Sequence, residues 1–365
     1  FVAVAVEPAQ VLAWGFNGYG QTSALAGLGA VTAISAGGDG HTVALKSNGT
    51  VVAWGDNRFG QTNVPAGLSE VTAIAAGHSY TVALKSNGSI VAWGNNVEGQ
   101  TNVPVSLSGV VAIAAGVHHT LALKNDGTVV ERGGNFYRQQ AIPSGLGGVT
   151  AVAAGFYHSL ALKSDGTIVA WGDNRYGATT VPTGLTGVTA IACGGLHSLA
   201  VKSDGTVVAW GAGRTNTGLN EEWGQSIVPT GLSSVIGVVG GGGQTVALKS
   251  DGTVATWGRN DFGQRTVPFG LSRVAAIAAG VYHTVALVDW ASSVAPLIAT
   301  QPANQSVAVG ASASFAVGAT GATPLSYQWR KDGIAIPSAT NATLSLGNTT
   351  SLSAGNYDVV VSNFL

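Results

Sequence analysis

Charged residues are scarce in this sequence. Lysine, arginine, aspartate and glutamate make up 9% of its 365 residues, where about 25% is usual. The formal net charge is −1, so the chain has no strong positive field to attract nucleic acid, and we expect no nucleic-acid partner. Apolar residues reach 45%, which excludes an intrinsically disordered chain, because disorder requires low hydrophobicity.

Cysteine, methionine and long apolar runs are also missing or nearly so. The single cysteine, Cys193, permits no internal disulfide, so strand pairing and packing must stabilise the fold. No run of 18 or more apolar residues occurs, and we expect no membrane span. The sequence begins at Phe1 and has no methionine, which indicates a processed or excised segment whose signal peptide, if any, lies outside it.

Glycine, by contrast, is abundant, at 54 residues, and it recurs in two motifs. Trp-Gly returns at spacings of 40, 39 and 47 residues, with Arg132-Gly133 at the same phase where a tryptophan is missing. Gly-x-x-His returns in register with it, and Tyr80 and Gln244 replace histidine in two copies. Each motif therefore counts seven copies. The repeated residues are Trp14, Trp54, Trp93, Trp171, Trp210, Trp257, His41, His119, His158, His197 and His283.

Each repeat consists of short, alternating or β-branched runs bounded by Gly, Asn, Asp or Pro, which is typical of antiparallel strands. Six Asn-Gly or Asp-Gly pairs predict two-residue hairpin turns with positive φ. Seven units of four strands predict an all-β chain with a seven-bladed β-propeller over residues 1–290. The seventh copy lacks its turn, so we expect residues 274–288 and 11–28 to close the last blade together, with residues 1–8 added at this seam.

Two segments carry a family resemblance. The strings WGDNRFGQTNVP at 54–65 and GVTAIACGGLHSLAV at 187–201 resemble the regulator of chromosome condensation repeat, and the likeness extends over residues 10–288. Within that family the units are most similar to those of propeller-type β-lactamase inhibitors. The resemblance implies a β-propeller, structural histidines, and partner contacts in the loops of one face. The family's nucleotide-exchange role on a small GTPase is not expected here, because no basic tail or chromatin-binding arm is present.

The repeat stops after Leu287, and a second domain is expected. We predict a linker at 291–298 and an immunoglobulin-like β-sandwich at 299–365. Trp329 would be its core tryptophan and Tyr357 its corner tyrosine.

Two features set this second domain apart from an ordinary immunoglobulin-like fold. Val317 and Val359 stand near the places where the usual cysteines would fall, so aliphatic packing would replace the disulfide. Leu365 falls about where the final strand should begin, so we expect an incomplete domain with an unpaired edge. That edge could be completed by another segment or could support self-association.

The repeated residues do not predict chemistry. One histidine in each blade spreads the imidazoles around a ring, so we expect structural roles, no metal and no cofactor. No catalytic motif occurs, and Glu221 and Glu222 are adjacent and would point apart on a strand; we therefore expect no enzymatic activity. Arg132 either covers with its stem the surface that a tryptophan would cover, which we favour, or marks a blade altered for a partner.

The meander places the Gly-x-x-His loops and the loops after Trp-Gly on one face, which we expect to bind a partner. The loop at 211–225 is eight residues longer than its counterparts and carries charged residues and a tryptophan. Aromatic and arginine side chains on a charge-poor face are typical of a protein-binding surface. The candidates are Arg214, Glu221, Glu222, Trp223, His118, Phe136, Tyr137, Phe156, Tyr157 and Tyr282. Lysines before the hairpin turns belong to the opposite face, where neighbouring aspartates cancel much of their charge.

The leading hypothesis is a secreted or cell-surface, bacterial-type protein that binds another protein with one propeller face. One alternative is an enzyme inhibitor of the β-lactamase-inhibitor kind. Another is carbohydrate binding, with Trp223 and nearby tyrosines as stacking platforms for sugars. A third is a structural module of a large adhesin or surface fibre.

Overall fold

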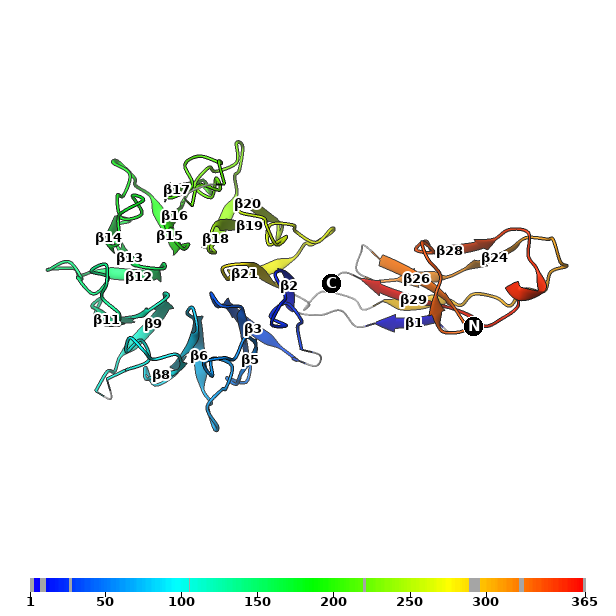
Figure 1. The fold of residues 1–365 in the computed structure, drawn as a ribbon, viewed down its shortest axis with the longest axis horizontal. Helices are drawn as coiled ribbons and strands as arrows, with labels where there is room; N and C mark the ends of the chain where they lie inside the picture. The colour runs from blue at the N-terminus through cyan, green and yellow to red at the C-terminus, as the bar shows by residue number, and fades with distance from the viewer. Residues whose placement is uncertain are drawn as a thin grey trace. The chain divides into compact units, whose positions relative to one another are not determined.

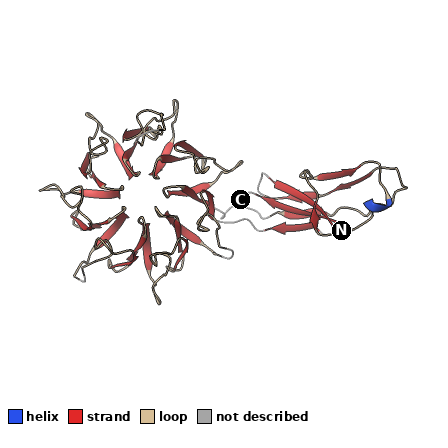
Figure 2. Ribbon diagram, viewed as in Figure 1, coloured by secondary structure: helices blue, strands red, loops and turns tan. Residues whose placement is uncertain are grey.

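The computed structural model describes most of the chain in two compact units, residues 11–288 and residues 1–10 with 289–365. Nearly all of its regular structure is strand, and the one helical segment among the described residues is the 3-10 turn Ser351–Ser353 (Figure 2). No helix in the described part is long and apolar enough to cross a membrane. The described residues are 3–6, 11–25, 28–104, 106–218, 221–288, 296–321 and 325–363.

The described residues of the first unit form seven three-stranded antiparallel sheets around a central axis, in the arrangement of a β-propeller (Figure 1). We number these sheets blades 1 to 7 in chain order. Blades 1 to 3 comprise β3 (Val31–Ala36), β4 (His41–Lys46), β5 (Val51–Gly55); β6 (Val71–Ala76), β7 (Tyr80–Lys85), β8 (Ile90–Gly94); and β9 (Val110–Ala115), β10 (His119–Lys124), β11 (Val129–Gly133). Blades 4 to 6 comprise β12 (Val149–Ala154), β13 (His158–Lys163), β14 (Ile168–Gly172); β15 (Val188–Cys193), β16 (His197–Lys202), β17 (Val207–Gly211); and β18 (Val235–Gly240), β19 (Gln244–Lys249), β20 (Val254–Gly258). Blade 7 comprises β21 (Val274–Ala279), β22 (His283–Val288) and β2 (Val11–Gly15).

Burial follows the position of each strand within its blade. The first strand lines a central channel of about 300 Å³, whose walls combine alanines such as Ala36 and Ala115 with isoleucines, valines and Cys193. The middle strand, for example β4, is buried at every residue except its terminal lysine. The third strand carries the tryptophan, which packs against the preceding blade, as Trp93 does against Val43 and Leu45. The apolar core therefore lies between neighbouring blades.

The ends of the repeat region close the ring. β2 pairs antiparallel with β22, with Val11 opposite Leu287 and Gly15 opposite His283. Blade 7 thus takes two strands from the end of the propeller and one from its beginning, as the missing turn in the sequence predicted. The pairing covers the edge of β22 and so joins the two ends of the repeat region through one sheet.

The prediction of four strands in each blade was wrong. The segment after the third strand forms consecutive turns instead, as between Asn57 and Pro65. Asn57 Oδ1 accepts the Thr62 amide at 3.0 Å, and Asn57 Nδ2 donates to Asn63 Oδ1 at 2.8 Å. These side-chain bonds curl the backbone, and Pro65 has no amide to donate to a ladder. In six of the seven blades the outer edge is therefore a loop held by an asparagine; the exception is blade 5, with the long loop at 211–225.

The hairpin turns also differ from the prediction. Each loop has four residues, as in 47–50, and only the glycine takes a positive φ, which is 76° at Gly49. The Gly49 amide donates to the Lys46 carbonyl at 2.9 Å, and Asn48 Oδ1 accepts the Thr50 amide at 3.1 Å. Asn or Asp serves here as an acceptor, because a turn followed by a glycine bulge requires left-handed backbone at the glycine alone.

The second unit packs one four-stranded sheet and two two-stranded sheets around one core. Trp329 is fully buried between residues such as Phe315, Leu344 and Val359, and its Nε1 donates to the Asn341 carbonyl at 2.9 Å. The strands are β1 (Ala3–Val6), β23 (Leu297–Thr300), β24 (Ala313–Ala316), β25 (Gly318–Thr320), β26 (Leu325–Lys331), β27 (Ile334–Ala335), β28 (Thr343–Leu346) and β29 (Tyr357–Asn363). The immunoglobulin-like class itself stays a prediction.

Individual residues of this unit lie where the sequence suggested. The Tyr357 hydroxyl donates to the Ser353 carbonyl at 2.8 Å, four residues upstream. Val317 and Val359 are both buried in the Trp329 core. The predicted linker extends too far, however, because β23 begins at Leu297 and pairs with β25; residues 291–295 lie outside the described part of the chain.

The prediction for the N-terminal residues was wrong. β1 does not join the propeller seam but pairs in parallel with β29, with Ala3 opposite Val359 and Val6 opposite Ser362. Its residues belong to the second unit, not to a propeller over 1–290. The edge of β29 that we expected to be open is therefore occupied by a strand of the same chain. Alternation in this segment predicted a strand correctly, but it could not predict which sheet the strand would join.

Candidate functional site: an aromatic loop face

Two sets of loops meet on one face of the propeller, which we name the loop face. One set connects the first and second strands and ends in the repeated histidine; the other follows the third strand. Backbone hydrogen bonds join the two sets within a blade, as from Phe16 N to Tyr282 O at 2.9 Å, from Gly134 N to His118 O at 2.7 Å, and from Asp173 N to Tyr157 O at 2.8 Å. Side chains from both sets therefore share one surface.

The repeated histidines lie beneath this surface and connect neighbouring blades. His41 Nε2 lies 3.2 Å from Thr81 Oγ1 of the next blade. Because Thr81 already donates its hydroxyl hydrogen to the Gln61 carbonyl at 2.9 Å, His41 must donate from Nε2. The remaining pairs are His119 with Ser159 at 3.1 Å, His158 with Ser198 at 3.0 Å, His197 with Thr245 at 2.9 Å and His283 with Thr42 at 3.2 Å. Tyr80 and Gln244 replace the histidine by donating to the His119 and Gly280 carbonyls.

These five imidazoles are neutral. Burial lowers the pKa of His41 and His158 to about 4, and that of His119, His197 and His283 to about 3. Each ring packs on a glycine of its own loop: a Cβ added to Gly194 would lie 1.9 Å from His197 Cε1. The Gly-x-x-His motif is thus a packing requirement, and no group of three potential metal ligands occurs among the described residues.

The first cluster of exposed and half-buried rings lies on blades 3 and 4. Tyr157 lies 4.9 Å from Tyr137 and 6.0 Å from His118, measured between ring centroids. Phe136, on the same loop as Tyr137, is 63% exposed and lies 6.1 Å from His118. Phe156 lies 6.3 Å from Tyr157 and lines the mouth of the central channel. The structure therefore brings together five of the predicted side chains, which we name cluster A: His118, Phe136, Tyr137, Phe156 and Tyr157.

The second cluster lies at the seam of the ring, and the predicted residue in it is Tyr282. Tyr282 contacts Phe262 at 5.1 Å and Phe16 at 6.4 Å, and Phe16 lies 6.0 Å from Tyr19. We name Phe16, Tyr19, Phe262 and Tyr282 cluster B. Phe16 was missed because it occupies a position that is Asp, Asn or Gly in most other blades, so it breaks the repeat. That departure from the repeat was the signal available in the sequence.

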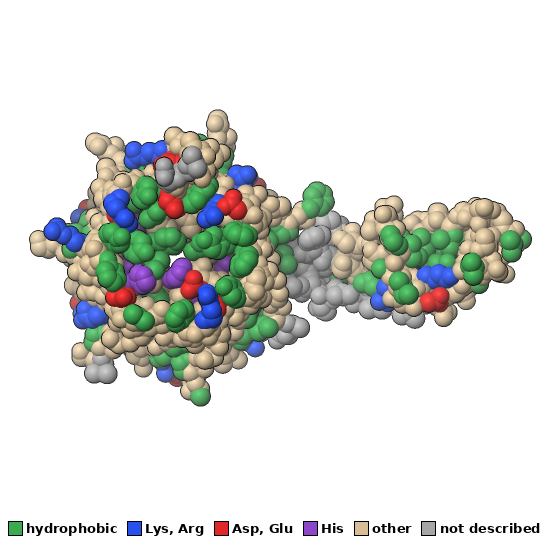
Figure 3. Space-filling model, viewed as in Figure 1, with side chains coloured by type: hydrophobic (Ala, Val, Ile, Leu, Met, Phe, Trp, Pro, Cys, Tyr) green, Lys and Arg blue, Asp and Glu red, His purple; other side chains and the backbone are tan. Residues whose placement is uncertain are grey.

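Arginines cover several of these rings. The Arg175 guanidinium carbon lies 4.2 Å from the Tyr137 centroid, and Arg175 is fixed by Asp173 at 2.8 Å. Arg259 lies 4.5 Å from the Trp223 ring and 5.1 Å from the Tyr282 ring. Cation–π contacts of this kind hold an aromatic side chain in one orientation. Hydrophobic side chains gather around the central opening in the face that Figure 3 shows, with histidine and charged groups among them.

In the long loop at 211–225, the Glu222 carboxylate is bonded within the loop. Glu222 Oε2 accepts the Thr215 amide at 2.8 Å and the Thr215 hydroxyl at 3.0 Å. Burial alone would raise the pKa of Glu222, but these hydrogen bonds outweigh it and lower the pKa. Glu221 takes a positive φ of 66°, and its carbonyl accepts Gln225 Nε2 at 2.7 Å. Both glutamates shape the loop.

The other two predicted residues of this loop lie against neighbouring loops. A Cβ added to Gly243 would lie 2.6 Å from Trp223 Cε3, so the indole packs on blade 6. A Cβ added to Gly177 would lie 3.0 Å from Arg214 Nη2, which places the exposed Arg214 head over the loop of blade 4. Trp223 is therefore half-buried, while Arg214 is accessible.

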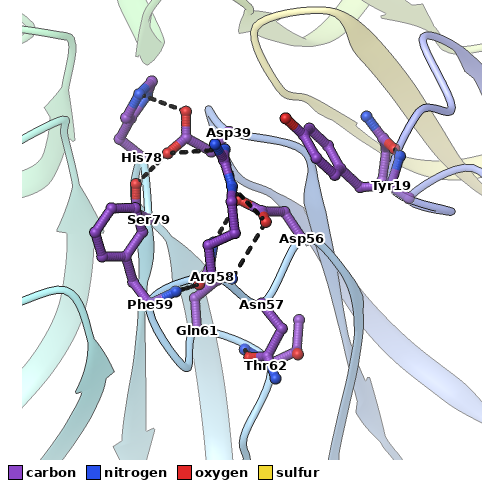
Figure 4. Close-up of polar contacts among 11 residues, drawn as sticks. Tyr19, Asp39, Asp56, Asn57, Arg58, Phe59, Gln61, Thr62, His78 and Ser79 are labelled. Carbon is purple, nitrogen blue, oxygen red and sulfur yellow. Dashed lines mark hydrogen bonds and ion pairs between the residues drawn. The ribbon is translucent and has the colours of Figure 1, made fainter.

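A polar group at the channel mouth was not predicted as a unit. His78 Nε2 lies 2.8 Å from Asp39 Oδ1, and Ser79 donates to the same carboxylate. Arg58, fixed by Asp56 at 2.9 Å, lies 3.9 Å from Asp39 (Figure 4). Partial burial alone would raise the pKa of Asp39, but the hydrogen bonds from His78 and Ser79 have the larger effect, so the pKa is lowered. Because these partners engage the carboxylate, it is not free to act as a general base.

The structure also contains a buried carboxyl that the sequence analysis missed. Glu131 stands in β11 where most blades have alanine, and its Oε2 accepts Trp171 Nε1 of the next blade at 2.9 Å. Burial raises the pKa of Glu131 to about 8. Because burial also lowers the pKa of His119 to about 3, the 3.8 Å contact between these two side chains joins neutral groups at neutral pH. Glu131 therefore acts in packing between blades.

The opposite face is neutralised, as expected. Four lysines before the hairpin turns pair with the aspartate two residues later. The pairs are Lys124 with Asp126 at 2.9 Å, Lys163 with Asp165 at 3.1 Å, Lys202 with Asp204 at 2.9 Å and Lys249 with Asp251 at 3.0 Å. This face therefore presents no concentrated charge.

Radial three-stranded sheets with a shared loop face define the class of protein: a β-propeller. The sequence profile of the regulator of chromosome condensation (RCC1) repeat matches residues 31–61, 71–100, 149–178, 188–215 and 235–264. Each match covers the three strands of one blade, in blades 1, 2, 4, 5 and 6. The chain thus carries RCC1 repeats. No curated protein sequence matches it significantly.

Solved structures show the same fold. Human WBSCR16 aligns with a TM-score of 0.63 at 20% identity, over 77% of this chain and 100% of that one. Prp20p from Saccharomyces cerevisiae, described with its binding to Gsp1p and histones, aligns with a TM-score of 0.62 at 20% identity, over 77% of this chain and 92% of that one. The CRINKLY ectodomain of the Arabidopsis thaliana receptor kinase ACR4 gives 0.55 at 22% identity, over 73% and 96%.

Proposed function

We propose that the propeller is a non-enzymatic module that binds another protein through its loop face. The observation that carries this proposal is cluster A, in which exposed and half-buried rings are held by one another and by Arg175. Rigid aromatic anchors and arginine are the side chains that dominate binding energy at protein interfaces. Because neighbours already fix these rings, little side-chain entropy remains to be lost on binding.

The charges of the loop face support binding over catalysis. Asp39 is engaged by His78 and Ser79, and Glu222 by Thr215. A general base needs a carboxylate or imidazole free to reach a substrate proton. The carboxylates described here are held by internal partners, which favours a non-enzymatic role.

Carbohydrate binding through Trp223 receives less support. The indole packs on Gly243, and the Arg259 guanidinium lies 4.5 Å from its ring. A sugar stacking on this ring would have to displace the arginine. A protein partner can instead use the arginine–aromatic surface as it stands.

The wider setting of the proposal is a secreted or cell-surface protein. Low charge and two all-β units in one chain support this setting. A crystal structure shows yeast Prp20, which shares the fold, in complex with Kap60. A protein with this fold can therefore bind another protein. A narrower form of the proposal is that the protein inhibits an enzyme. For a β-lactamase, the test is to measure residual hydrolysis of a chromogenic β-lactam in the presence of excess protein.

The experiment compares capture of binding proteins by the full chain and by two variants. Tyr157→Ala removes the centre of cluster A, whereas Ile236→Ala removes an exposed apolar side chain, 59% accessible, at the start of β18 near the opposite face. We expect wild type and Ile236→Ala to capture the same amount of partner, and Tyr157→Ala to capture at least tenfold less. Equal capture by both variants, with both folded by circular dichroism, would contradict the proposal.

A further inference from the structure

Arg132 interrupts a repeated packing arrangement between blades. In most other blades the indole of the third strand enters a socket on the preceding blade and donates Nε1–H to a backbone carbonyl there. These bonds are Trp54 to Gln21 at 3.0 Å, Trp93 to Gln61 at 3.0 Å, Trp171 to Gln139 at 2.8 Å, Trp210 to Ala178 at 2.8 Å and Trp257 to Gln225 at 2.9 Å. Each socket is therefore built for an indole.

The apolar walls of these sockets also repeat. Trp93 packs among Val51, Val64 and Leu68 of blade 1. Trp210 packs among Ile168, Val181 and Leu185 of blade 4, which occupy the same positions in the repeat.

The socket between blades 2 and 3 keeps these walls but has no indole. Its equivalent residues are Ile90, Val103 and Leu107, and they line a slot of about 10 Å³ together with Gln100 and Arg132. The slot shares Pro104, Leu107, Val130 and Arg132 with an adjoining groove of about 230 Å³. The groove lies beside the arginine stem and gives a path from solvent to the slot. Because binding a benzene-sized ring takes an apolar cavity of about 150 Å³, the slot has room for a ring only once the arginine stem moves out.

The polar groups of the socket are also available. In the part of the chain that the structure describes, the Gln100 carbonyl accepts one side-chain hydrogen bond, from Thr120 Oγ1 at 2.8 Å, whereas the Gln61 carbonyl accepts from both Thr81 and Trp93. Arg132 is exposed and donates from Nη1 to the Glu131 carbonyl at 2.8 Å. No described carboxylate forms a salt bridge with it, so its charge is free for a ligand.

We propose that this socket binds the tryptophan side chain of a partner protein, at a tryptophan that has an acidic residue beside it. The indole displaces the Arg132 stem, packs on Ile90, Val103 and Leu107, and donates its N–H to the Gln100 carbonyl. The Arg132 guanidinium, now outside the slot, pairs with the neighbouring carboxylate. The site lies between the blades and is separate from the loop face, so it does not depend on the proposed function of that face.

Indole-3-acetate, which carries both an indole and a carboxylate, tests the proposal by NMR titration of the full chain. We expect saturable binding, with shifts confined to blades 2 and 3. Methylating the indole nitrogen removes the bond to Gln100, and we expect about fivefold weaker binding, the equivalent of one ordinary hydrogen bond.

Two variants separate this site from others. Arg132→Trp places an indole in the socket from within the chain, and we expect it to abolish binding. Arg132→Glu keeps an exposed polar residue, so the fold should be retained while binding of the carboxylate probe weakens severalfold. Tyr157→Ala on the loop face should bind as wild type does. Absence of saturable binding to wild type, or unchanged binding to Arg132→Trp and Arg132→Glu, would overturn the proposal.

Discussion

His283 Nε2 lies 3.2 Å from Thr42 Oγ1, although 241 residues separate them in the sequence. The first belongs to the last blade and the second to the first blade, so this hydrogen bond spans the seam of the propeller. It is one of seven equivalent contacts beneath the loop face, of which five use histidine and two use Tyr80 and Gln244. The junction between the last and the first blade is therefore held in the same way as the four other junctions that use histidine.

Thr42→Val should destabilise the chain by about 1–3 kcal/mol, because the buried His283 donor loses its acceptor and the hydroxyl bond to the Gln21 carbonyl is lost. Urea unfolding followed by circular dichroism measures the change. Thr32→Val is the matched control: it removes a hydroxyl that donates to the Leu45 carbonyl at 3.3 Å, but at an exposed residue of the same blade, so stability should change by less than about 0.5 kcal/mol. Equal effects of the two substitutions would show that the seam bond contributes nothing.

Gly194→Ala should cost about 2 kcal/mol or more, because its new Cβ would lie 1.9 Å from His197 Cε1 and would push the ring away from Thr245. Gly237 in β18 has open space, with nothing within 4 Å of an added Cβ. Gly237→Ala should therefore be neutral or stabilise by up to about 1 kcal/mol. The same unfolding measurement compares them, and a neutral Gly194→Ala would refute the packing role of the motif.

The sequence could predict the features that repeat, and it failed where residues act across repeats. The phase of Trp-Gly and Gly-x-x-His was enough to place the seam, because a missing turn in a periodic pattern has one location. It could not show that Glu131 reaches Trp171, since the two are 40 residues apart and lie in different blades. Nor could it place Ala3 opposite Val359, because parallel pairing between chain ends leaves no local pattern.

The loop face was predictable in outline for a similar reason. Strand alternation determines which loops share a face, so Tyr157 and Tyr137 could be assigned to one surface. Their 4.9 Å contact and the position of Arg175 over Tyr137 depend on loop geometry, which has no repeat. Nor could the sequence show that the Glu222 carboxylate accepts hydrogen bonds from Thr215, because a charged loop looks the same from sequence whether its carboxylates bond within the loop or face a partner.

Acid should unfold the propeller through its buried histidines. Their pKa values of about 3 to 4 lie below the 6.5 of an unfolded chain, so the unfolded state binds more protons between about pH 6.5 and 4. Stability is therefore present above pH 6.5 and is lost as the pH falls through this window, by up to tenfold in the unfolding constant per pH unit for each histidine.

His283→Gln, which copies the residue found at Gln244, should reduce that acid dependence by one proton. Urea unfolding at pH 7, 6 and 5 measures the slope for wild type and variant. A slope that is the same in both, or a wild-type stability that does not change from pH 7 to pH 5, would contradict the prediction.

Glu131 should produce the opposite dependence at higher pH. Its pKa of about 8 in the folded chain exceeds the ordinary 4.5, so between these values the folded state holds a proton that the unfolded state has released. Stability is fully present below about pH 4.5 and falls as the pH rises to about 8, above which the contribution is constant. In the unfolded chain the histidines, with a pKa of 6.5, still titrate just above pH 7, so the difference in stability between wild type and a Glu131 variant is what isolates Glu131. Glu131→Gln keeps an oxygen for Trp171 Nε1 but cannot ionise, so the stability of wild type should fall relative to that of Glu131→Gln as the pH rises from 7 to 8. Glu70→Gln, at a side chain that is 66% exposed, is the control and should follow the wild-type curve; a constant difference between wild type and Glu131→Gln would mean that Glu131 is ionised in the folded chain at neutral pH.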